Sequence, residues 1–249
     1  MDRRAELAAR LSQVRGRIAA ACADAGRDPG EITLVAVTKT YPAEDVALLA
    51  DLGVRDIGEN RDQEAAPKAA AVAALGAEVR WHFVGQLQRN KCRSVVGYAD
   101  VVHSVDSVRL AATLGEAARR HRSRPLDVLV QVSIDGDLAR GGALRGGDAR
   151  GDEGPRADVP DRMIDRVAAT VAGSEALRLA GVMAMAPQTW RPADAFALLE
   201  EEAHRLRASY PTAAVISAGM SGDLEAAIAH GATHVRIGTA LLGKRAPLG

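Results

Sequence analysis

The chain has 249 residues, with 32 basic and 32 acidic side chains that cancel to a formal net charge of zero, and 47% of its residues are hydrophobic but only 3% aromatic. This neutral balance gives no field that would draw the chain to nucleic acid or to an anionic membrane, and the scarcity of rings disfavours base stacking on single strands. The N-terminal segment is too charged for a signal peptide and no apolar run approaches the roughly 18 residues of a spanning helix, so we expect a cytoplasmic globular protein.

A first amphipathic helix is predicted over residues 3–25, because apolar side chains recur there at helical spacing: Leu7, Leu11, Val14 and Ile18. The turn-forming run "GRDPGE" ends this helix. Cys22 lies on it, far in sequence from Cys92 and without metal-ligand spacing. We therefore expect two free thiols and no metal site.

Apolar runs and helical patterns alternate along the rest of the chain. The runs that predict strands are 32–38, 55–58, 80–84, 100–103, 126–133, 178–184, 213–217 and 234–238. The helical patterns lie near 43–52, 61–75, 88–97, 106–121, 160–173, 192–209 and 221–231. Continuous apolar runs separated by amphipathic helices indicate a parallel sheet that is covered by helices.

Eight such units predict an α/β fold that forms one domain over residues 1–249, a closed (β/α)₈ barrel of the TIM type with an extra N-terminal helix. That helix would pack outside the barrel or plug its bottom. The alternative is an open, doubly wound sheet, against which no G-x-G-x-x-G run follows the first strand. Residues 136–160 are rich in Gly, Arg and Asp, and they predict a flexible insertion that is either a lid or an unstructured surface loop.

Polar residues at the carboxyl ends of barrel strands converge on one pocket, and Lys39 is the most distinctive of them. It follows the apolar run "LVAVT" in a chain that has only four lysines among its 32 basic residues. A lysine, unlike an arginine, can attack a carbonyl as a neutral amine, and burial at a strand end would favour that neutral form. The alternative is a surface lysine whose stem lies along the strand end.

The run "SAGMSGDLEAAIAHGATHVRIGT", residues 217–239, predicts an anion site. A Gly-rich turn before a helix offers free backbone N–H groups, and the loops after strands seven and eight form the usual phosphate site of such a barrel. The candidate residues are Ser217, Gly219, Met220, Ser221, Gly238 and Thr239. The alternative is two ordinary turns that use glycine for close packing.

An amine at one edge of a pocket and an anion cradle at the other suit a small phosphorylated aldehyde. Pyridoxal 5′-phosphate is one candidate, and the substrate of a class I aldolase is the other. Asn60 either bonds a cofactor's ring hydroxyl or caps the helix after it. His82 is either a cofactor contact or a packed core histidine.

Five ordered motifs, spread over residues 3–243, carry a resemblance to a known family: "LVAVTKTYP", "IGENRDQE", "WHFVGQLQRNK", "HSVDS" and "GMSGDLEAAIAHGATHVRIGT". Together they resemble the pyridoxal phosphate homeostasis protein family. The chain departs from the family pattern at Ala218, where a methionine is common, and near Gly141, where Lys-Ser-Gly is usual. These departures affect the lid and any partner surface rather than the cofactor site.

The resemblance implies a barrel similar to the N-terminal domain of alanine racemase. It also implies that Lys39 carries pyridoxal 5′-phosphate as a Schiff base, that Arg236 lies beside the cofactor, and that the phosphate is held by Ser221, Gly238 and Thr239.

The expected function is that of a carrier that maintains intracellular pyridoxal phosphate and passes it to apo-enzymes, without robust catalysis. Racemisation needs a base on each face of the cofactor, and alanine racemases take one of them, a tyrosine, from a second domain. Only Tyr41 is near Lys39 in sequence, and Pro42 suggests that this tyrosine turns outward. The alternatives are a weak racemase or lyase that uses the same Schiff base, and a class I aldolase without the cofactor. We expect a monomer that binds neither nucleic acid nor membrane.

Overall fold

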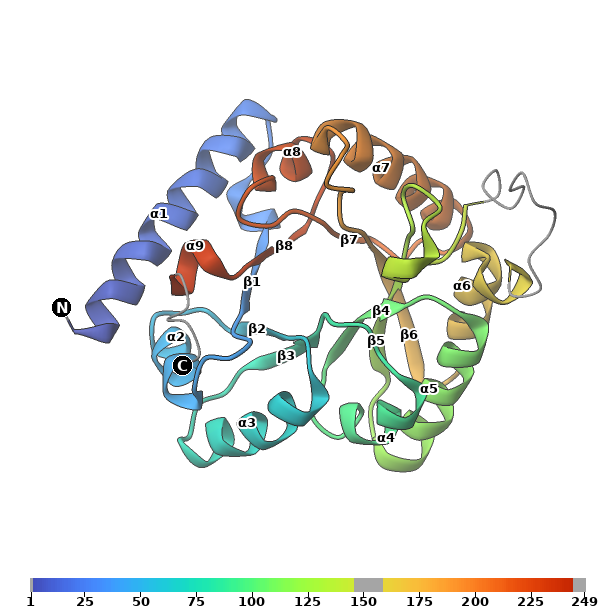
Figure 1. Cartoon of the computed structure of the whole chain (residues 1–249), viewed down its shortest axis with the longest axis horizontal. Helices are drawn as coiled ribbons and strands as arrows, with labels where there is room; N and C mark the ends of the chain where they lie inside the picture. Colours follow the sequence, from blue (N-terminus) through green and yellow to red (C-terminus); the bar gives the residue numbers. More distant parts are fainter. Residues whose placement is uncertain (1, 146–158, 244–249) are drawn as a thin grey trace.

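The computed structural model describes residues 2–145 and 159–243. Within them the chain forms a closed barrel of eight parallel strands in sequence order, in which β8 pairs with β1. Figure 1 looks down this ring and shows the helices around it. The predicted barrel is confirmed, and the open doubly wound sheet is excluded because an open sheet would leave β1 and β8 unpaired with each other.

All eight predicted strands are present, with bounds close to those expected. The strands are β1 Thr33–Val37, β2 Asp56–Glu59, β3 Arg80–Phe83, β4 Val101–Val105, β5 Leu126–Gln131, β6 Leu177–Met183, β7 Val215–Ser217 and β8 His234–Ile237. The helices are α1 Arg3–Asp24, α2 Ala43–Asp51, α3 Asp62–Ala74, α4 Cys92–Val95, α5 Val108–His121, α6 Ile164–Ala172, α7 Pro192–Ser209, α8 Leu224–Ala229 and α9 Thr239–Leu242. The helix predicted near 88–97 is shorter than expected, because a 3₁₀ turn, η2 Arg89–Lys91, precedes α4.

The core sits between the strands and the helices that cover them. Every residue of β4 and β5 is buried, as expected for strands that face the barrel interior on one side and helices on the other. Cys22 and Cys92 are both buried and free, as predicted. Burial raises the pKa of the Cys92 thiol to about 11, so it is protonated and unreactive at neutral pH.

The N-terminal helix α1 packs on the outside of the barrel and does not plug its bottom. Its apolar face, which includes Leu7, Leu11 and Val14, is buried, and the helix lies against α8 and α9 (Figure 1). Arg17 of this helix donates a hydrogen bond of 2.9 Å to the carbonyl of Ser221 in the loop after β7. Helix α1 therefore braces the loops that follow the last two strands.

The segment after β5 differs from the flexible insertion that the sequence predicts over 136–160. Ala143 and Leu144 are buried, and the amide of Ala143 donates to the carbonyl of Gln131 at 2.6 Å. Ala143 and Leu144 therefore extend the packing around β5. These two apolar side chains are enough to dock this part of the Gly-rich segment against the barrel. The rest of the predicted insertion, residues 146–158, lies outside the described residues.

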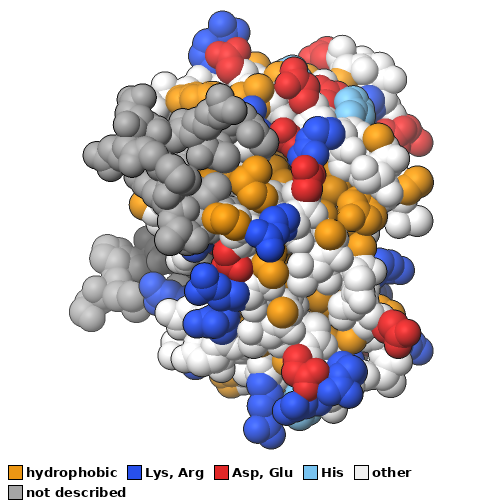
Figure 2. All heavy atoms as spheres, turned by 90° about the vertical axis from the view of Figure 1, so that its right-hand side faces the viewer, with side chains coloured by type: hydrophobic (Ala, Val, Ile, Leu, Met, Phe, Trp, Pro, Cys, Tyr) orange, Lys and Arg blue, Asp and Glu red, His pale blue; other side chains and the backbone are white. Residues whose placement is uncertain are grey.

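The surface carries charges of both signs in close mixture. On the face shown in Figure 2, basic and acidic side chains are interspersed and neither dominates. Within residues 2–145 and 159–243, no helix is both long enough and apolar enough to cross a membrane.

Candidate functional site

A cavity of about 780 Å³ opens at the carboxyl ends of the strands. This volume lies in the range of small-molecule sites. Its walls come from the loops after β1, β2, β3, β6, β7 and β8, with Val37, Gln131 and Arg236 from the strands themselves. The predicted site residues among its lining are Lys39, Asn60, Met220, Ser221, Arg236, Gly238 and Thr239.

Lys39 lines this cavity, but the expectation that it is buried is wrong. Strand β1 ends at Val37, and Thr38 takes the buried position that follows it. Lys39 stands one residue further along, and its side chain is exposed at the cavity mouth. The role of this amine therefore depends on what enters the cavity beside it.

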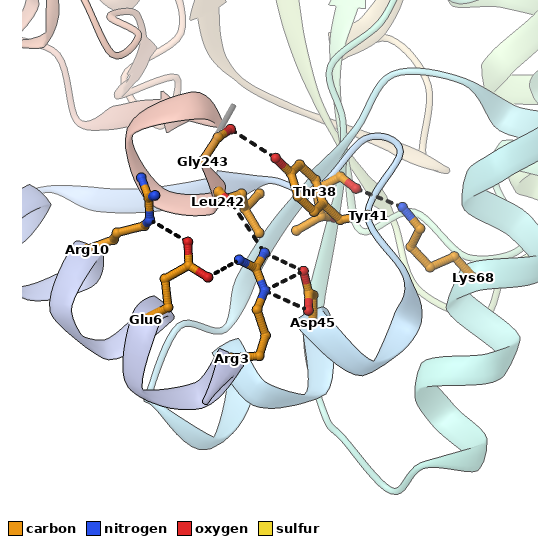
Figure 3. Close-up of polar contacts among 9 residues, drawn as sticks. All are labelled: Arg3, Glu6, Arg10, Thr38, Tyr41, Asp45, Lys68, Leu242 and Gly243. Atoms are coloured by element: carbon orange, nitrogen blue, oxygen red, sulfur yellow. Dashed lines mark hydrogen bonds and ion pairs between the residues drawn. The ribbon is translucent and has the colours of Figure 1, made fainter. Parts of the chain in front are cut away.

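The turn that carries Lys39 is held from three sides. The carbonyl of Thr38 accepts hydrogen bonds from the Lys68 ammonium at 2.8 Å and from the amide of Tyr41 at 3.0 Å. The Tyr41 hydroxyl donates to the carbonyl of Gly243 at 2.9 Å, so this side chain lines the cavity instead of turning outward as its neighbouring proline suggests. Figure 3 shows the contact between Lys68 and Thr38 and the contact between Tyr41 and Gly243.

The amino-terminal end of α1 lies behind this turn. Arg3 pairs with Asp45 of α2 at 2.6 Å, and its guanidinium carbon is 5.6 Å from the centre of the Tyr41 ring. Arg3 also donates to the carbonyl of Leu242 at 3.3 Å (Figure 3). Helix α1 thus ties together α2, the turn after β1 and the end of α9.

Thr40 is the one non-glycine residue with a left-handed backbone in the described part of the chain, with φ of 67°. A β-branched residue pays a steric cost of about 1–2 kcal/mol in this region. We expect Thr40→Gly to raise the free energy of unfolding by about 1 kcal/mol, measured by urea denaturation. The matched control is Thr113→Gly in α5, where the backbone is helical and glycine should lower stability by roughly 0.3–0.5 kcal/mol. A loss of stability in Thr40→Gly would contradict this assignment of strain.

The loops after β7 and β8 meet at one edge of the cavity. The Ser221 hydroxyl accepts a hydrogen bond of 3.3 Å from the amide of Ala240, which joins the two loops. The backbone amides of Ser221, Gly222, Gly238 and Thr239 donate to no acceptor among the described residues. A cluster of free N–H groups at a cavity edge is suited to bind a phosphate.

Arg236 forms part of the cavity floor and is only 5% exposed. Its Nη1 donates to the carbonyl and to the hydroxyl of Ser217, both at 2.7 Å, and its Nη2 donates to the carbonyl of Ala184 at 2.9 Å. Burial lowers its pKa to about 10, so it is still a cation at neutral pH. No carboxylate of the described residues lies within ion-pairing distance of it, which leaves a positive floor for an anionic ligand.

Asn60 follows β2 and lines the cavity, but it does not cap the next helix. The N-cap position of α3 is Arg61, and no side chain bonds the free amides there. The Asn60 Oδ1 is buried and has no hydrogen-bond partner within the described residues. Gly85 presses on the same residue, since a Cβ there would come within 2.0 Å of the Asn60 carbonyl oxygen. This packing fixes Asn60 and leaves its side-chain oxygen for a ligand or water.

Three predicted residues do not line the cavity. His82 is a buried residue of β3, 1% exposed, and both of its ring nitrogens are already hydrogen-bonded within the barrel. Ser217 is fully buried beneath Arg236. Gly219 packs against α8, where a Cβ would lie 2.7 Å from that of Ala227. These residues support the cavity from below instead of forming its wall.

The histidines inside the barrel make stability depend on pH. Burial, with the neighbouring His82 ring, holds the pKa of His103 well below its usual value, and burial lowers that of His234 to about 4. Below about pH 6.5 these histidines take up protons in the unfolded chain but not in the folded one. The contribution of these two histidines to the free energy of unfolding is therefore fully present above about pH 6.5 and is lost as the pH falls below that value. We expect the free energy of unfolding, measured in urea, to fall by about 2–3 kcal/mol between about pH 7.5 and 5.5.

The comparison that isolates this effect is His234→Gln, which removes one of the two histidines. In this variant the loss between the same two pH values should be about half as large. A free energy of unfolding that stays constant over the range would contradict the neutral state of both rings in the folded protein.

Some cavity residues were not predicted as site residues, among them Gln86, Gln131, Met185, Gly222 and Gly243. Gln131 is the last residue of β5, but the apolar run that predicts this strand continues to residue 133 and hides its end. Met185 follows β6 at a position where the sequence already placed a strand end. The feature that could have identified Gln131 and Met185 is their position at or just after the end of a strand, where side chains reach the cavity.

The fold and cavity define a barrel of the alanine racemase N-terminal-domain class, and the model of that domain matches residues 10–246. The pyridoxal phosphate homeostasis protein of Mycobacterium leprae is 45% identical over 254 residues, which cover 97% of this chain and 94% of the relative. The protein of the same name from Escherichia coli K12 is 38% identical over 244 residues, covering 96% and 97% of the two chains. This chain therefore belongs to the pyridoxal phosphate homeostasis protein family, as its five motifs predict.

Solved structures agree with this placement. PipY of Synechococcus elongatus, solved with pyridoxal phosphate bound, is 31% identical with a TM-score of 0.74, over 95% of this chain and 100% of that one. An alanine racemase of Clostridium difficile is 14% identical with a TM-score of 0.65, and the match covers 96% of this chain but 57% of that one. The second likeness concerns the fold alone.

Proposed function

We propose that this protein binds pyridoxal 5′-phosphate, holds it as a Schiff base on Lys39 and keeps the free cofactor at a low concentration inside the cell. The observation that carries the proposal is that one cavity contains a lysine amine, a cluster of free amides and a buried cation. The cofactor supplies an aldehyde that condenses reversibly with amines. A single cavity with these groups holds both ends of such a molecule.

Each group of the cavity has its own task in this proposal. The amides of Ser221, Gly222, Gly238 and Thr239 receive the phosphate, whose charge the neighbouring Arg236 cation also favours. The unpaired Asn60 Oδ1 accepts a hydrogen bond from the ring hydroxyl or from a water beside it.

The proposal favours a carrier over an efficient enzyme. An enzyme that racemises an amino acid needs acid–base groups on both faces of the cofactor. The one tyrosine of the cavity lining, Tyr41, already donates its proton to the carbonyl of Gly243. This contact supports a structural role for Tyr41 and leaves no second tyrosine in the described cavity lining to act opposite Lys39.

The partners of a carrier are apo-enzymes that require pyridoxal phosphate. We propose that the loaded protein is a cytoplasmic monomer and that it transfers the cofactor to such an enzyme. The exposed position of Lys39 at the cavity mouth supports transfer, since an acceptor amine can reach the Schiff base without unfolding the barrel.

The test compares transfer with turnover. The loaded protein is mixed with an apo-enzyme that depends on pyridoxal phosphate, and it is separately supplied with a panel of L-amino acids. We expect reactivation of the apo-enzyme and no D-amino acid or keto acid at enzyme-like rates. Turnover of an amino acid would establish the racemase or lyase alternative, and a colourless protein that traps a sugar phosphate on Lys39 would establish the aldolase alternative.

A further inference from the structure

Five side chains form an unbroken series of hydrogen bonds through the barrel interior. Arg236 Nη1 donates to Ser217 Oγ at 2.7 Å, and Ser217 Oγ lies 2.9 Å from His103 Nδ1. His103 Nε2 then lies 2.8 Å from His82 Nδ1, and His82 Nε2 lies 2.8 Å from Asp56 Oδ1. The residues belong to β8, β7, β4, β3 and β2, so the series crosses the ring of strands seen in Figure 1. We call it the interior chain.

The two ends of the interior chain fix the direction of every hydrogen bond in it. Arg236 can only donate, so Ser217 Oγ accepts from it and turns its own proton to His103 Nδ1. His103 then carries its proton on Nε2 and donates to His82 Nδ1. His82 likewise carries its proton on Nε2 and donates to the Asp56 carboxylate, which can only accept.

The reverse arrangement fails at Ser217. If His103 donated from Nδ1, the Ser217 oxygen would accept two hydrogen bonds, and its own proton would have no acceptor among the described residues. A buried donor without a partner is costly. The geometry therefore favours two neutral histidines with the proton on Nε2, and the low pKa of His103 agrees with it.

The interior chain joins two faces of the barrel. Arg236 faces the ligand cavity at the carboxyl ends of the strands. Asp56, at the other end of the chain, lines a depression between α1 and the amino-terminal ends of the strands, and its side chain is 22% exposed. Between them Ser217, His103 and His82 have almost no exposure to solvent.

We propose that His82 and His103 are positioning residues, which orient Ser217 and through it hold the Arg236 guanidinium at the cavity floor for the anionic ligand. This inference rests on the proposed function, because the ligand is taken to be pyridoxal 5′-phosphate. Arg236 has no carboxylate partner within the described residues, so its direction depends on Ser217 and on the carbonyl of Ala184. Because the Ser217 hydroxyl donates its proton to His103, its orientation is fixed. It can then accept the hydrogen bond from Arg236 from one direction only.

The first test measures the histidine tautomers in the ligand-free protein, by two-bond ¹H–¹⁵N spectra of histidine-labelled samples near neutral pH. We expect both His82 and His103 to be neutral with the proton on Nε2. In Ser217→Ala the ¹⁵Nδ1 resonance of His103 should move toward that of a nitrogen without a hydrogen bond. A charged ring, or an Nδ1 proton on either histidine of the unmodified protein, would overturn the proposal.

The far end of the interior chain provides a matched pair of variants. Asp56→Asn keeps an acceptor for His82 and should keep both tautomers. Asp56→Leu removes the acceptor, but Arg236 and Ser217 still fix the direction of the series, so we expect His103 to keep its proton on Nε2 while the His82 Nε2–H resonance moves toward that of a group without a protein acceptor. A His103 that changes tautomer in Asp56→Leu would overturn the proposal, because the direction of the hydrogen bonds would then be set by Asp56 and not by Ser217.

The second test measures the dissociation constant for pyridoxal 5′-phosphate. Ser217→Ala should bind about 10–100-fold more weakly, while Asp56→Asn and His234→Gln, which alters a histidine outside the interior chain, should stay within about twofold. Equal affinity in Ser217→Ala and the unmodified protein would overturn the positioning role even if the tautomers are as expected. An unmodified protein with the expected tautomers but no affinity for pyridoxal phosphate would instead overturn the proposed function, and the positioning role with it.

Discussion

Replacing Lys68 with methionine is expected to lower the free energy of unfolding by about 3–5 kcal/mol. The Lys68 ammonium lies 2.5 Å from Glu59 Oε1, and the two side chains are 9% and 0% exposed. Thr38 donates to the same oxygen at 2.7 Å. Methionine fills the space of the lysine stem but leaves the Glu59 carboxylate without its cation in the barrel wall. Urea denaturation measures the loss.

The matched control for this prediction is Lys91→Met. Lys91 lies 3.7 Å from Asp62 and is 32% exposed, so its removal should cost no more than about 1 kcal/mol. Adding Glu59→Gln to Lys68→Met should restore a large part of the lost stability, because the amide needs no counter-ion. Similar losses in the two single lysine variants would contradict the assignment of Lys68 and Glu59 as a buried, mutually dependent pair.

Replacing Lys39 with alanine is expected to abolish the visible absorbance of a bound imine, because no other amine among the described residues of the cavity lining can form it. The phosphate contacts remain, so weak binding should persist with a dissociation constant about 100-fold higher, a difference of roughly 2.7 kcal/mol. Lys39→Arg provides the control for charge, since it keeps a cation at the cavity mouth but cannot condense with an aldehyde. Titration with pyridoxal phosphate, followed by its absorbance, measures both effects.

The two Lys39 variants separate covalent attachment from electrostatics. If Lys39→Arg regained tight binding, the lysine would serve as a charge and not as a nucleophile. If Lys39→Ala kept the full imine absorbance, another amine would carry the cofactor. Lys91→Met should behave like the unmodified protein in this assay, because Lys91 lies outside the cavity lining.

The strands and their order could be predicted because short segments with buried apolar residues alternate with helical patterns along the chain. The run around Val101–Val105 shows why: buried strands of a parallel barrel need apolar residues on both faces, and this composition is visible without any contact. The position of Lys39 followed from the same rule, since a side chain just after a strand must lie at the edge of the barrel. Its exposure did not follow, because it depends on a left-handed turn at Thr40 that no local motif predicts.

The interior chain could not be predicted from the sequence. His103 and Ser217 are 114 residues apart, and they meet only because the closed barrel brings the side chains of β4 and β7, three strands apart in the ring, together in its interior. A histidine on a strand is compatible with a cofactor contact, a packed core position or a polar network, and local sequence does not distinguish these. The same holds for Lys68, which lies on α3 and reaches the carbonyl of Thr38 only in the folded barrel.

The measurement that tests the central claim most directly is the location of the covalent bond. The protein is loaded with pyridoxal 5′-phosphate, reduced with borohydride, digested and mapped by mass spectrometry. We expect the reduced pyridoxyl phosphate group on the peptide that contains Lys39 and an unmodified side chain at Lys68 and Lys91. A label on either of those lysines, or a protein that carries no label after reduction, would contradict the account.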